Sequence, residues 1–102
     1  MSVYIIALLK FTDVERYRRY QKAFPEVFAK SNGTVVMADE TPRRVEGDQT
    51  VDKVVVLGFP SEADAAAFQK STEYQAISED RKAGADATVF MVRGLDGPMA
   101  VP

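Results

Sequence analysis

Two short stretches of this chain are apolar at every position, and they limit its fold more than any other feature. Residues 3–9 read Val-Tyr-Ile-Ile-Ala-Leu-Leu, and residues 54–57 read Val-Val-Val-Leu. A run of β-branched and aromatic residues without polar alternation is typical of a strand that is covered on both faces. We therefore expect residues 3–11 and 51–59 to form the interior strands of a sheet.

Helical spacing and capping signals separate these strands from the rest of the chain. From Asp13, a plausible N-cap, apolar and long side chains recur every three or four residues until Ser31-Asn32-Gly33, where Gly33 suits a left-handed helix end. A second helical region begins at the cap Ser61. It breaks at a fresh cap, Ser71, and resumes as far as Gly84.

Two further strands are expected, and both lie outside the apolar runs. One begins at residue 34 and continues through Pro42 to a turn at residues 46–48, where proline and charge mark an edge strand. The other covers residues 87–93 and leaves residues 94–102 as a tail.

The predicted order is strand, helix, strand, strand, helix, strand, in one domain over residues 1–93. Right-handed crossovers fold this order into an α+β, ferredoxin-like βαββαβ sandwich with the two apolar strands in the middle of an antiparallel sheet. Its helices cover one face, yet the central strands are apolar on both. We therefore expect a symmetric homodimer, packed sheet against sheet into a dimeric α/β barrel.

Composition excludes several kinds of chemistry. The chain has 102 residues and a net charge of −2, which gives no field to attract nucleic acid. It contains no Cys and no His, so no disulfide, thiolate nucleophile, Ser-His-Asp triad or usual zinc or haem ligand set is expected. No basic leader precedes the first strand and no apolar run is long enough to span a bilayer, so we expect a soluble, cytoplasmic protein without cofactor or metal.

Several short motifs, taken in order, resemble a known family. They are residues 13–20 (Asp-Val-Glu-Arg-Tyr-Arg-Arg-Tyr), Gly33 before a strand, residues 45–47 (Val-Glu-Gly), residues 55–61 (Val-Val-Leu-Gly-Phe-Pro-Ser), and residues 71–75 (Ser-Thr-Glu-Tyr-Gln) followed by Arg81. Over residues 3–93 the chain resembles the family called domain of unknown function 1330.

This resemblance implies a dimeric α/β barrel. The same superfamily holds cofactor-free monooxygenases, muconolactone-isomerase-like proteins and haem-dependent chlorite dismutases. Phe68 stands where such sequences often carry Trp; the ring is still aromatic, but it lacks the indole N–H donor. The lack of His disfavours the haem branch.

Four residues are candidates for binding a ligand, and each also has a structural interpretation. Tyr17 and Tyr20 lie three apart on a helix, so both side chains can reach one cleft, either to orient a ligand or pass a proton or as core residues. Glu46 and Arg81, to which the resemblance points, can bind a polar group or form a structural salt bridge.

Three other features are weaker indications of a site. Pro25 inside the first helix predicts either a kink that opens a gap over the sheet or a mere bend or break. Ser71 has no evident base and fits a helix cap better than a nucleophile. The acidic residues of the hairpin alternate with Arg43 and Arg44 and lack calcium-loop spacing, which favours a solvated hairpin; they are Asp39, Glu40, Glu46, Asp48 and Asp52.

Three functions stay open at this point. The first is a cofactor-independent oxygenation or isomerisation of a small, largely apolar or aromatic molecule held between helix and sheet. The second is a module that binds or senses such a molecule without changing it, and the third is a structural dimer without a ligand. No catalytic residue is assigned.

Overall fold

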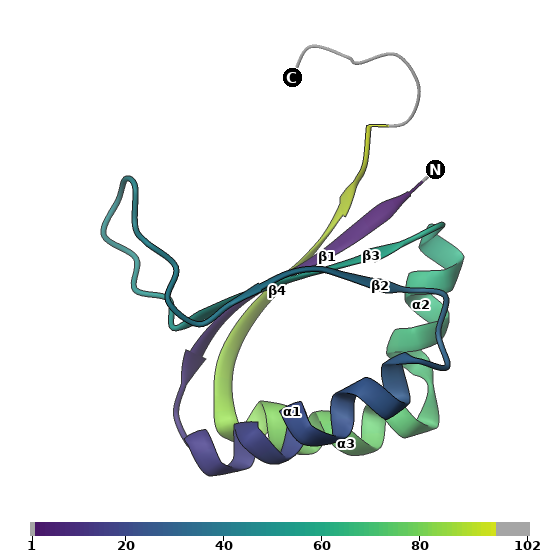
Figure 1. The fold of residues 1–102 in the computed structure, drawn as a ribbon, viewed down its shortest axis with the longest axis horizontal. Helices are drawn as coiled ribbons and strands as arrows, with labels where there is room; N and C mark the ends of the chain where they lie inside the picture. Colours follow the sequence, from purple (N-terminus) through teal and green to yellow (C-terminus); the bar gives the residue numbers. More distant parts are fainter. Residues whose placement is uncertain (1, 96–102) are drawn as a thin grey trace.

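The computed structural model describes residues 2–95, which form one sheet backed by three helices (Figure 1). Residues 96–102 of the predicted tail lie outside the described residues. The elements along the chain are β1 (Val3–Phe11), α1 (Val14–Phe28), β2 (Thr34–Asp39), β3 (Lys53–Phe59), α2 (Glu62–Lys70), α3 (Thr72–Gly84) and β4 (Ala85–Arg93). This is the predicted βαββαβ order, with the second helical region divided in two.

The four strands form an antiparallel sheet in the order β2-β3-β1-β4. Ile5 of β1 lies opposite Leu57 on one side and Met91 on the other, so β1 is paired along both edges. The prediction that the two apolar runs form the interior strands is confirmed. Within one chain the sheet stays open and is not closed into a barrel.

All three helices lie on one face of the sheet (Figure 1). On this face the side chains of Val3, Ile5 and Leu9 are no more than 6% exposed and pack into the core. Aromatic rings fill the end of the core beneath α2, with centroids 4.4–6.2 Å apart; they are Phe24, Phe28, Phe59, Phe68 and Tyr74. Such ring pairs stabilise a fold by more than the burial of their apolar surface alone.

The opposite face of the sheet, which we call the open face, carries no helix (Figure 1). Ile6 lies opposite Val56 and Phe90, and residues directly opposite in a ladder share a face. Phe90 is 53% exposed and Met37 is 59% exposed. The open face is therefore apolar, as predicted; its apolar residues are Tyr4, Ile6, Leu8, Val36, Met37, Val54, Val56, Phe90 and Val92.

The helices begin at the predicted caps. Asp13, Ser61 and Ser71 each accept a hydrogen bond, through the side-chain oxygen, from the backbone N–H three residues further on. These bonds satisfy donors that a helix start leaves unpaired. Ser71 has extended backbone angles, which is why α2 and α3 are two helices and not one.

The expected left-handed conformation of Gly33 is wrong. Of the described residues, Gly47 is the glycine with a positive φ, at 92°. Gly33 is needed for space, because a Cβ there would lie 2.6 Å from Phe28 Cζ and 2.7 Å from Phe59 Cε1. The chain leaves α1 through a turn closed by Ser31, whose hydroxyl donates to the Phe28 carbonyl.

The bounds of three strands also differ from expectation. β2 does not reach Pro42, since the Asp39 carboxylate accepts a hydrogen bond from Thr41 N at 2.8 Å and turns the chain. Residues 40–52 form a loop that projects on the side of the open face (Figure 1). β3 begins two residues later than expected, and β4 two residues earlier because α3 leads into it directly.

Candidate functional site

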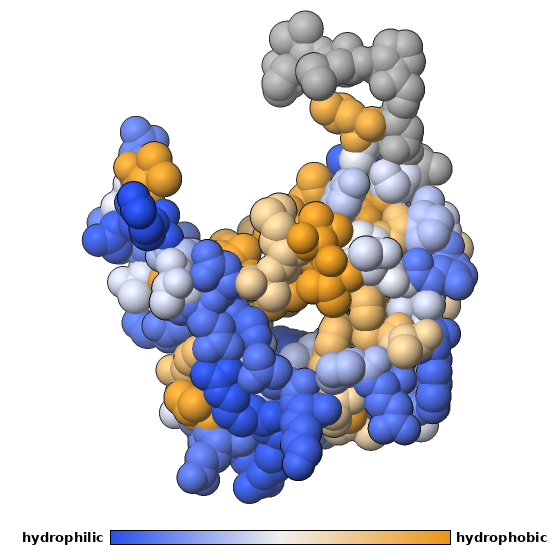
Figure 2. Space-filling view, viewed as in Figure 1, coloured by the Kyte–Doolittle hydropathy of each residue, from blue (hydrophilic) through white to orange (hydrophobic). Residues whose placement is uncertain are grey.

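A cavity of about 330 Å³ lies between the helices and the sheet. The space-filling view shows a hollow between these two layers (Figure 2). Apart from Lys53, its wall on the sheet side is apolar and comes mainly from the two interior strands; the apolar residues of these strands are Ile5, Ala7 and Leu9 of β1 and Val55 and Leu57 of β3. This volume lies near the lower end of the range for small-molecule sites, about 300–1,000 Å³.

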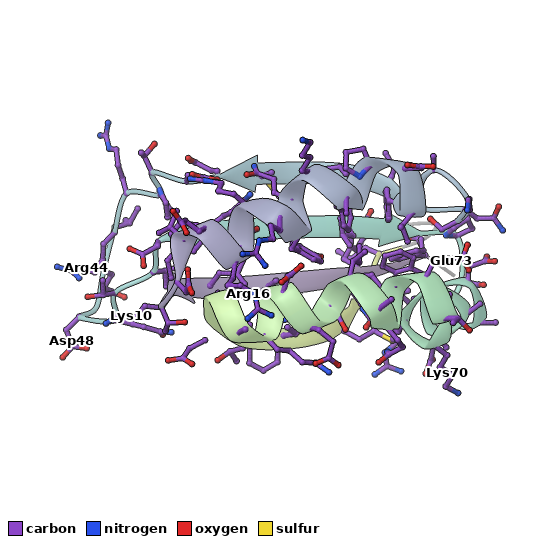
Figure 3. The ribbon with its side chains drawn as sticks, turned by 90° about the horizontal axis from the view of Figure 1, so that it is seen from below. Lys10, Arg16, Arg44, Asp48, Lys70 and Glu73 are labelled. Atoms are coloured by element: carbon purple, nitrogen blue, oxygen red, sulfur yellow. The ribbon has the colours of Figure 1, made fainter. Side chains whose placement is uncertain are left out.

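The helices supply most of the polar lining. Tyr17, Tyr20 and Gln21 come from α1, and Tyr74 and Arg81 come from α3. The helices are held together on their outer side by Arg16, whose Nε donates to the Asp80 carboxylate at 2.6 Å; Figure 3 shows Arg16 between α1 and α3. The polar groups of the cavity therefore stand on two fixed helices.

Pro25 also lines the cavity. α1 is one continuous helix from residue 14 to residue 28, so the alternative that it breaks and restarts at Pro25 is wrong. A proline in a helix removes one N–H donor, and its ring crowds the backbone carbonyl of the residue four positions earlier in the preceding turn. Here that turn carries Gln21, the neighbouring lining residue.

Tyr20 and Tyr74 face each other in the cavity wall. Their hydroxyl oxygens are 3.3 Å apart, so one hydroxyl donates to the other and the second proton is free to point elsewhere. Burial raises the pKa of Tyr20 well above its ordinary value, and the neighbouring Tyr74 raises this pKa further. Tyr20 is therefore a neutral hydrogen-bonding group at physiological pH and not a phenolate base.

Lys53 is a buried cation at the start of β3. Its side chain is 7% exposed, its Nζ lies 3.3 Å from Glu40 Oε2, and it stands 4.9 Å from the centroid of the Tyr17 ring. Glu40 also accepts two hydrogen bonds from the Arg18 guanidinium, at 2.5 and 2.7 Å. Chiefly the Arg18 hydrogen bonds, with Lys53 beside them, lower the pKa of Glu40 to about 2.

Arg81 reaches the cavity from the last turn of α3. Its Nε atom is buried and has no hydrogen-bond partner among the described residues. The acid next to it in the chain, Asp80, is engaged by Arg16 at 2.6 Å and by Arg19 at 3.9 Å. Buried polar groups normally have a partner, so Arg81 is an unusual feature of this cavity.

Three of the four predicted ligand-binding candidates meet in one cavity. Tyr17, Tyr20 and Arg81 all line it, whereas Glu46 is exposed on the loop of residues 40–52. Figure 3 shows Arg44 and Asp48 of this loop beyond the ends of the helices. Among residues 2–95, no ion pair joins Glu46 to Arg81.

The sequence reasoning missed Lys53 and Tyr74. Lys53 carries a weak signal, because it is a charge placed directly before an apolar run in an interior strand. Tyr74 lies one turn after the Ser71 cap, on the same helix as Arg81, so the cap itself indicated its position.

Ser71 and two acidic residues of the hairpin, Glu40 and Asp52, have structural roles. The Ser71 oxygen caps α3 by accepting from Tyr74 N at 3.2 Å. Asp52 accepts a hydrogen bond from Phe11 N at 2.8 Å, and Glu40 binds the two cations described above. In the described part of the chain, no three acidic side chains gather into a set that could hold a metal ion. None of the helices between residues 2 and 95 is long and apolar enough to cross a membrane.

The fold and the cavity define a small ferredoxin-like α+β protein with a chamber between its two layers. The chain belongs to the family described as domain of unknown function (DUF1330), whose model matches residues 2–95. The resemblance noted from the sequence is therefore confirmed. No curated protein matches the chain.

Solved structures support the same fold. A protein of unknown function from Rhodopseudomonas palustris is 20% identical with a TM-score of 0.80, over 94% of this chain and 84% of that one. SnoaB, a cofactor-independent oxygenase from Streptomyces nogalater, is 10% identical with a TM-score of 0.66, over 95% and 96%. A dimeric ferredoxin-like protein of unknown function from Thermobifida fusca is 18% identical with a TM-score of 0.64, over 89% of each chain.

Proposed function

We propose that this protein is a homodimer that binds a small, largely apolar molecule in the cavity between its helices and its sheet. The observation that carries this proposal is the lining of the cavity. Apolar side chains of β1 and β3 form one wall, and a few hydrogen-bonding groups converge from the other, among them Tyr20, Tyr74 and Arg81. This combination is typical of sites for small ligands.

The open face supports the homodimer. A contiguous apolar surface on a sheet is normally covered, and the helices of this chain lie on the other side. A second copy packed face to face across a two-fold axis would cover both surfaces at once. The dimeric protein from Thermobifida fusca has the same fold, which agrees with this arrangement.

A thermal-shift screen with small aromatic compounds, lactones and quinones tests the binding proposal. A molecule that binds the native state raises the melting temperature by mass action, and we expect at least one class to raise it by several degrees. Ala38→Phe, at an exposed position of the cavity lining, should abolish the shift. Ala76→Phe, exposed on α3 and outside the lining, should keep it. A screen without any hit, or a hit that Ala38→Phe leaves unchanged, would contradict the proposal.

A cofactor-independent reaction is a second candidate function, favoured by the fold likeness to the oxygenase SnoaB. In an oxygenation by O₂, one oxygen atom would enter the molecule, and the other would leave as water with two hydrogens of the substrate. An isomerisation would consume nothing. The cavity offers the hydroxyls of Tyr20 and Tyr74 as hydrogen-bonding groups to position the reacting atom.

Turnover of a screening hit decides between binding and catalysis. We expect Tyr20→Phe to slow conversion, measured as O₂ consumption or product formation, while the hit still binds. Tyr4→Phe, which removes a hydroxyl from the open face, is the matched control. If every hit is recovered unchanged, the protein binds its ligand without converting it.

A further inference from the structure

The charged groups that line the cavity are all positive. Within residues 2–95 the lining includes Lys53 and Arg81 and neither Asp nor Glu. The remaining polar groups are the hydroxyls of three tyrosines and the amides of two glutamines; they are Tyr17, Tyr20, Tyr74, Gln21 and Gln69. A ligand in this chamber therefore meets no carboxylate among the lining residues, although Lys53 is already paired with Glu40 outside the lining.

Among the described residues, the carboxylates near these cations are already shared with other basic side chains. Glu40 is shared between Lys53 and Arg18. Asp80, which precedes Arg81 in the chain, binds Arg16 and Arg19. Arg81 is thus the cation of the cavity that lacks a carboxylate partner in the described part of the chain, and one of its nitrogens is fully buried. A guanidinium in this state gains most from an oxygen acceptor that is itself charged.

The tyrosine pair adds a donor. Because one of the hydroxyls of Tyr20 and Tyr74 donates to the other, the second hydrogen remains for a ligand oxygen. Lys53 reaches the cavity beside the Tyr17 ring, and Arg81 reaches it from α3. The chamber therefore offers several donors to a ligand oxygen, and apart from Lys53 its sheet wall is apolar.

We infer that the ligand of this cavity is a small, mostly apolar molecule with one anionic oxygen group, either a carboxylate or an ionised phenol or enol, which Arg81 binds directly and Lys53 attracts. This inference rests on the proposed binding function and names its ligand class. The anionic group would lie against Arg81 of α3, with Lys53 at the start of β3 nearby, and the apolar body would lie against the apolar side chains of β1 and β3.

A matched pair of probes tests the charge requirement. 2-Naphthoate and 2-naphthamide have the same ring and nearly the same shape, and at neutral pH the first is an anion. We expect the wild-type protein to bind the naphthoate about tenfold to a hundredfold more tightly in calorimetry, as charge-assisted hydrogen bonds allow. In Arg81→Gln the preference should fall to within about threefold, while affinity for the amide stays the same.

Lys82→Gln is the matched control. Lys82 lies beside Arg81 in the last turn of α3, so it has the same charge and the same relation to the helix dipole, but it is exposed and outside the cavity lining. We expect Lys82→Gln to keep the preference for the naphthoate. Equal loss in both variants would mean that general charge and not the cavity attracts the anion, and would overturn the inference.

4-Nitrophenol separates the two kinds of anionic group, because its colour reports ionisation. We expect 4-nitrophenol to ionise at a lower pH when it is bound than when it is free. In Arg81→Gln, the difference between these two pH values should be smaller. Naphthoate preference without ionisation of the phenol would assign the site to carboxylates, and the reverse would assign it to phenols and enols. Equal binding of naphthoate and naphthamide, with no change in the phenol, would overturn the inference and leave the binding function intact. Binding of none of the probes, together with a screen without hits, would overturn both.

Discussion

Glu40 joins three elements through single side-chain contacts. It stands directly after β2, binds Arg18 of α1, and neutralises Lys53 of β3. Its lowered pKa of about 2 means that the charged form is stabilised by the folded protein. This stabilisation is complete above about pH 4.5, the ordinary value, and is lost as the pH falls toward 2.

We expect Glu40→Gln to lower the free energy of unfolding at pH 7 by roughly 1–3 kcal/mol, because it leaves Lys53 without its partner. The difference from wild type should shrink between pH 4.5 and pH 2, as measured by urea unfolding at several pH values. Glu46→Gln, at an exposed position without an ion pair in the described chain, should show little effect at any pH. A difference for Glu40→Gln that stays constant with pH would contradict the role of its charge.

Two glycines offer a graded test of packing. A Cβ at Gly84 would lie 2.4 Å from Tyr17 N, a backbone atom, whereas a Cβ at Gly33 would meet the rings of Phe28 and Phe59. Rings can tilt more easily than a helix backbone can shift. We expect both Ala substitutions to destabilise the protein, Gly84→Ala by about 3 kcal/mol or more and Gly33→Ala by roughly 1–2 kcal/mol. Ala83→Ser, next to Gly84 and exposed, is the control in the same urea unfolding assay.

The α2–α3 break depends on one side chain. Ser71 accepts from Tyr74 N and donates to the Phe68 carbonyl at 2.8 Å, so it both ends α2 and begins α3. We expect Ser71→Ala to cost about 1–2 kcal/mol of stability, and Ser71→Thr to recover most of it, because Thr keeps the hydroxyl. Thr72→Ala, exposed at the next position, should cost less than Ser71→Ala; a reversed order in thermal unfolding would contradict the capping role.

At the scale of the whole molecule, the open face leads to a testable expectation, namely that two copies of the chain associate through it. If two copies pack through it, a charge placed on this face must be buried without a partner, which costs several kcal/mol. We expect Phe90→Asp to reduce the native mass from twice the chain mass to 11.3 kDa in light scattering. Val14→Glu, at an exposed position on α1, should leave the mass of the dimer unchanged. A wild-type mass of 11.3 kDa at micromolar concentration would contradict the dimer.

How much of this structure was predictable depends on the range of the interactions involved. The interior strands and the caps at Asp13, Ser61 and Ser71 were predictable because local spacing determines them. Lys53 was not, since its place in the cavity depends on the pairing of β3 with β1 and on Glu40, which follows the neighbouring strand β2. For the same reason Glu46 could not be separated from Arg81 by sequence alone.

Successive side chains of β1 point to opposite sides of the sheet, so alternate residues of this one strand belong to two different surfaces of the protein. Ile5 and Ala7 border the chamber, while Ile6 and Leu8 belong to the face proposed to meet a second copy. A substitution at Ile5, Ala7 or Leu9 of β1 would therefore change the lining of the chamber and leave the open face as it is. A substitution at Tyr4, Ile6 or Leu8 would change the open face, through which we propose that two copies pair, and leave the lining of the chamber as it is.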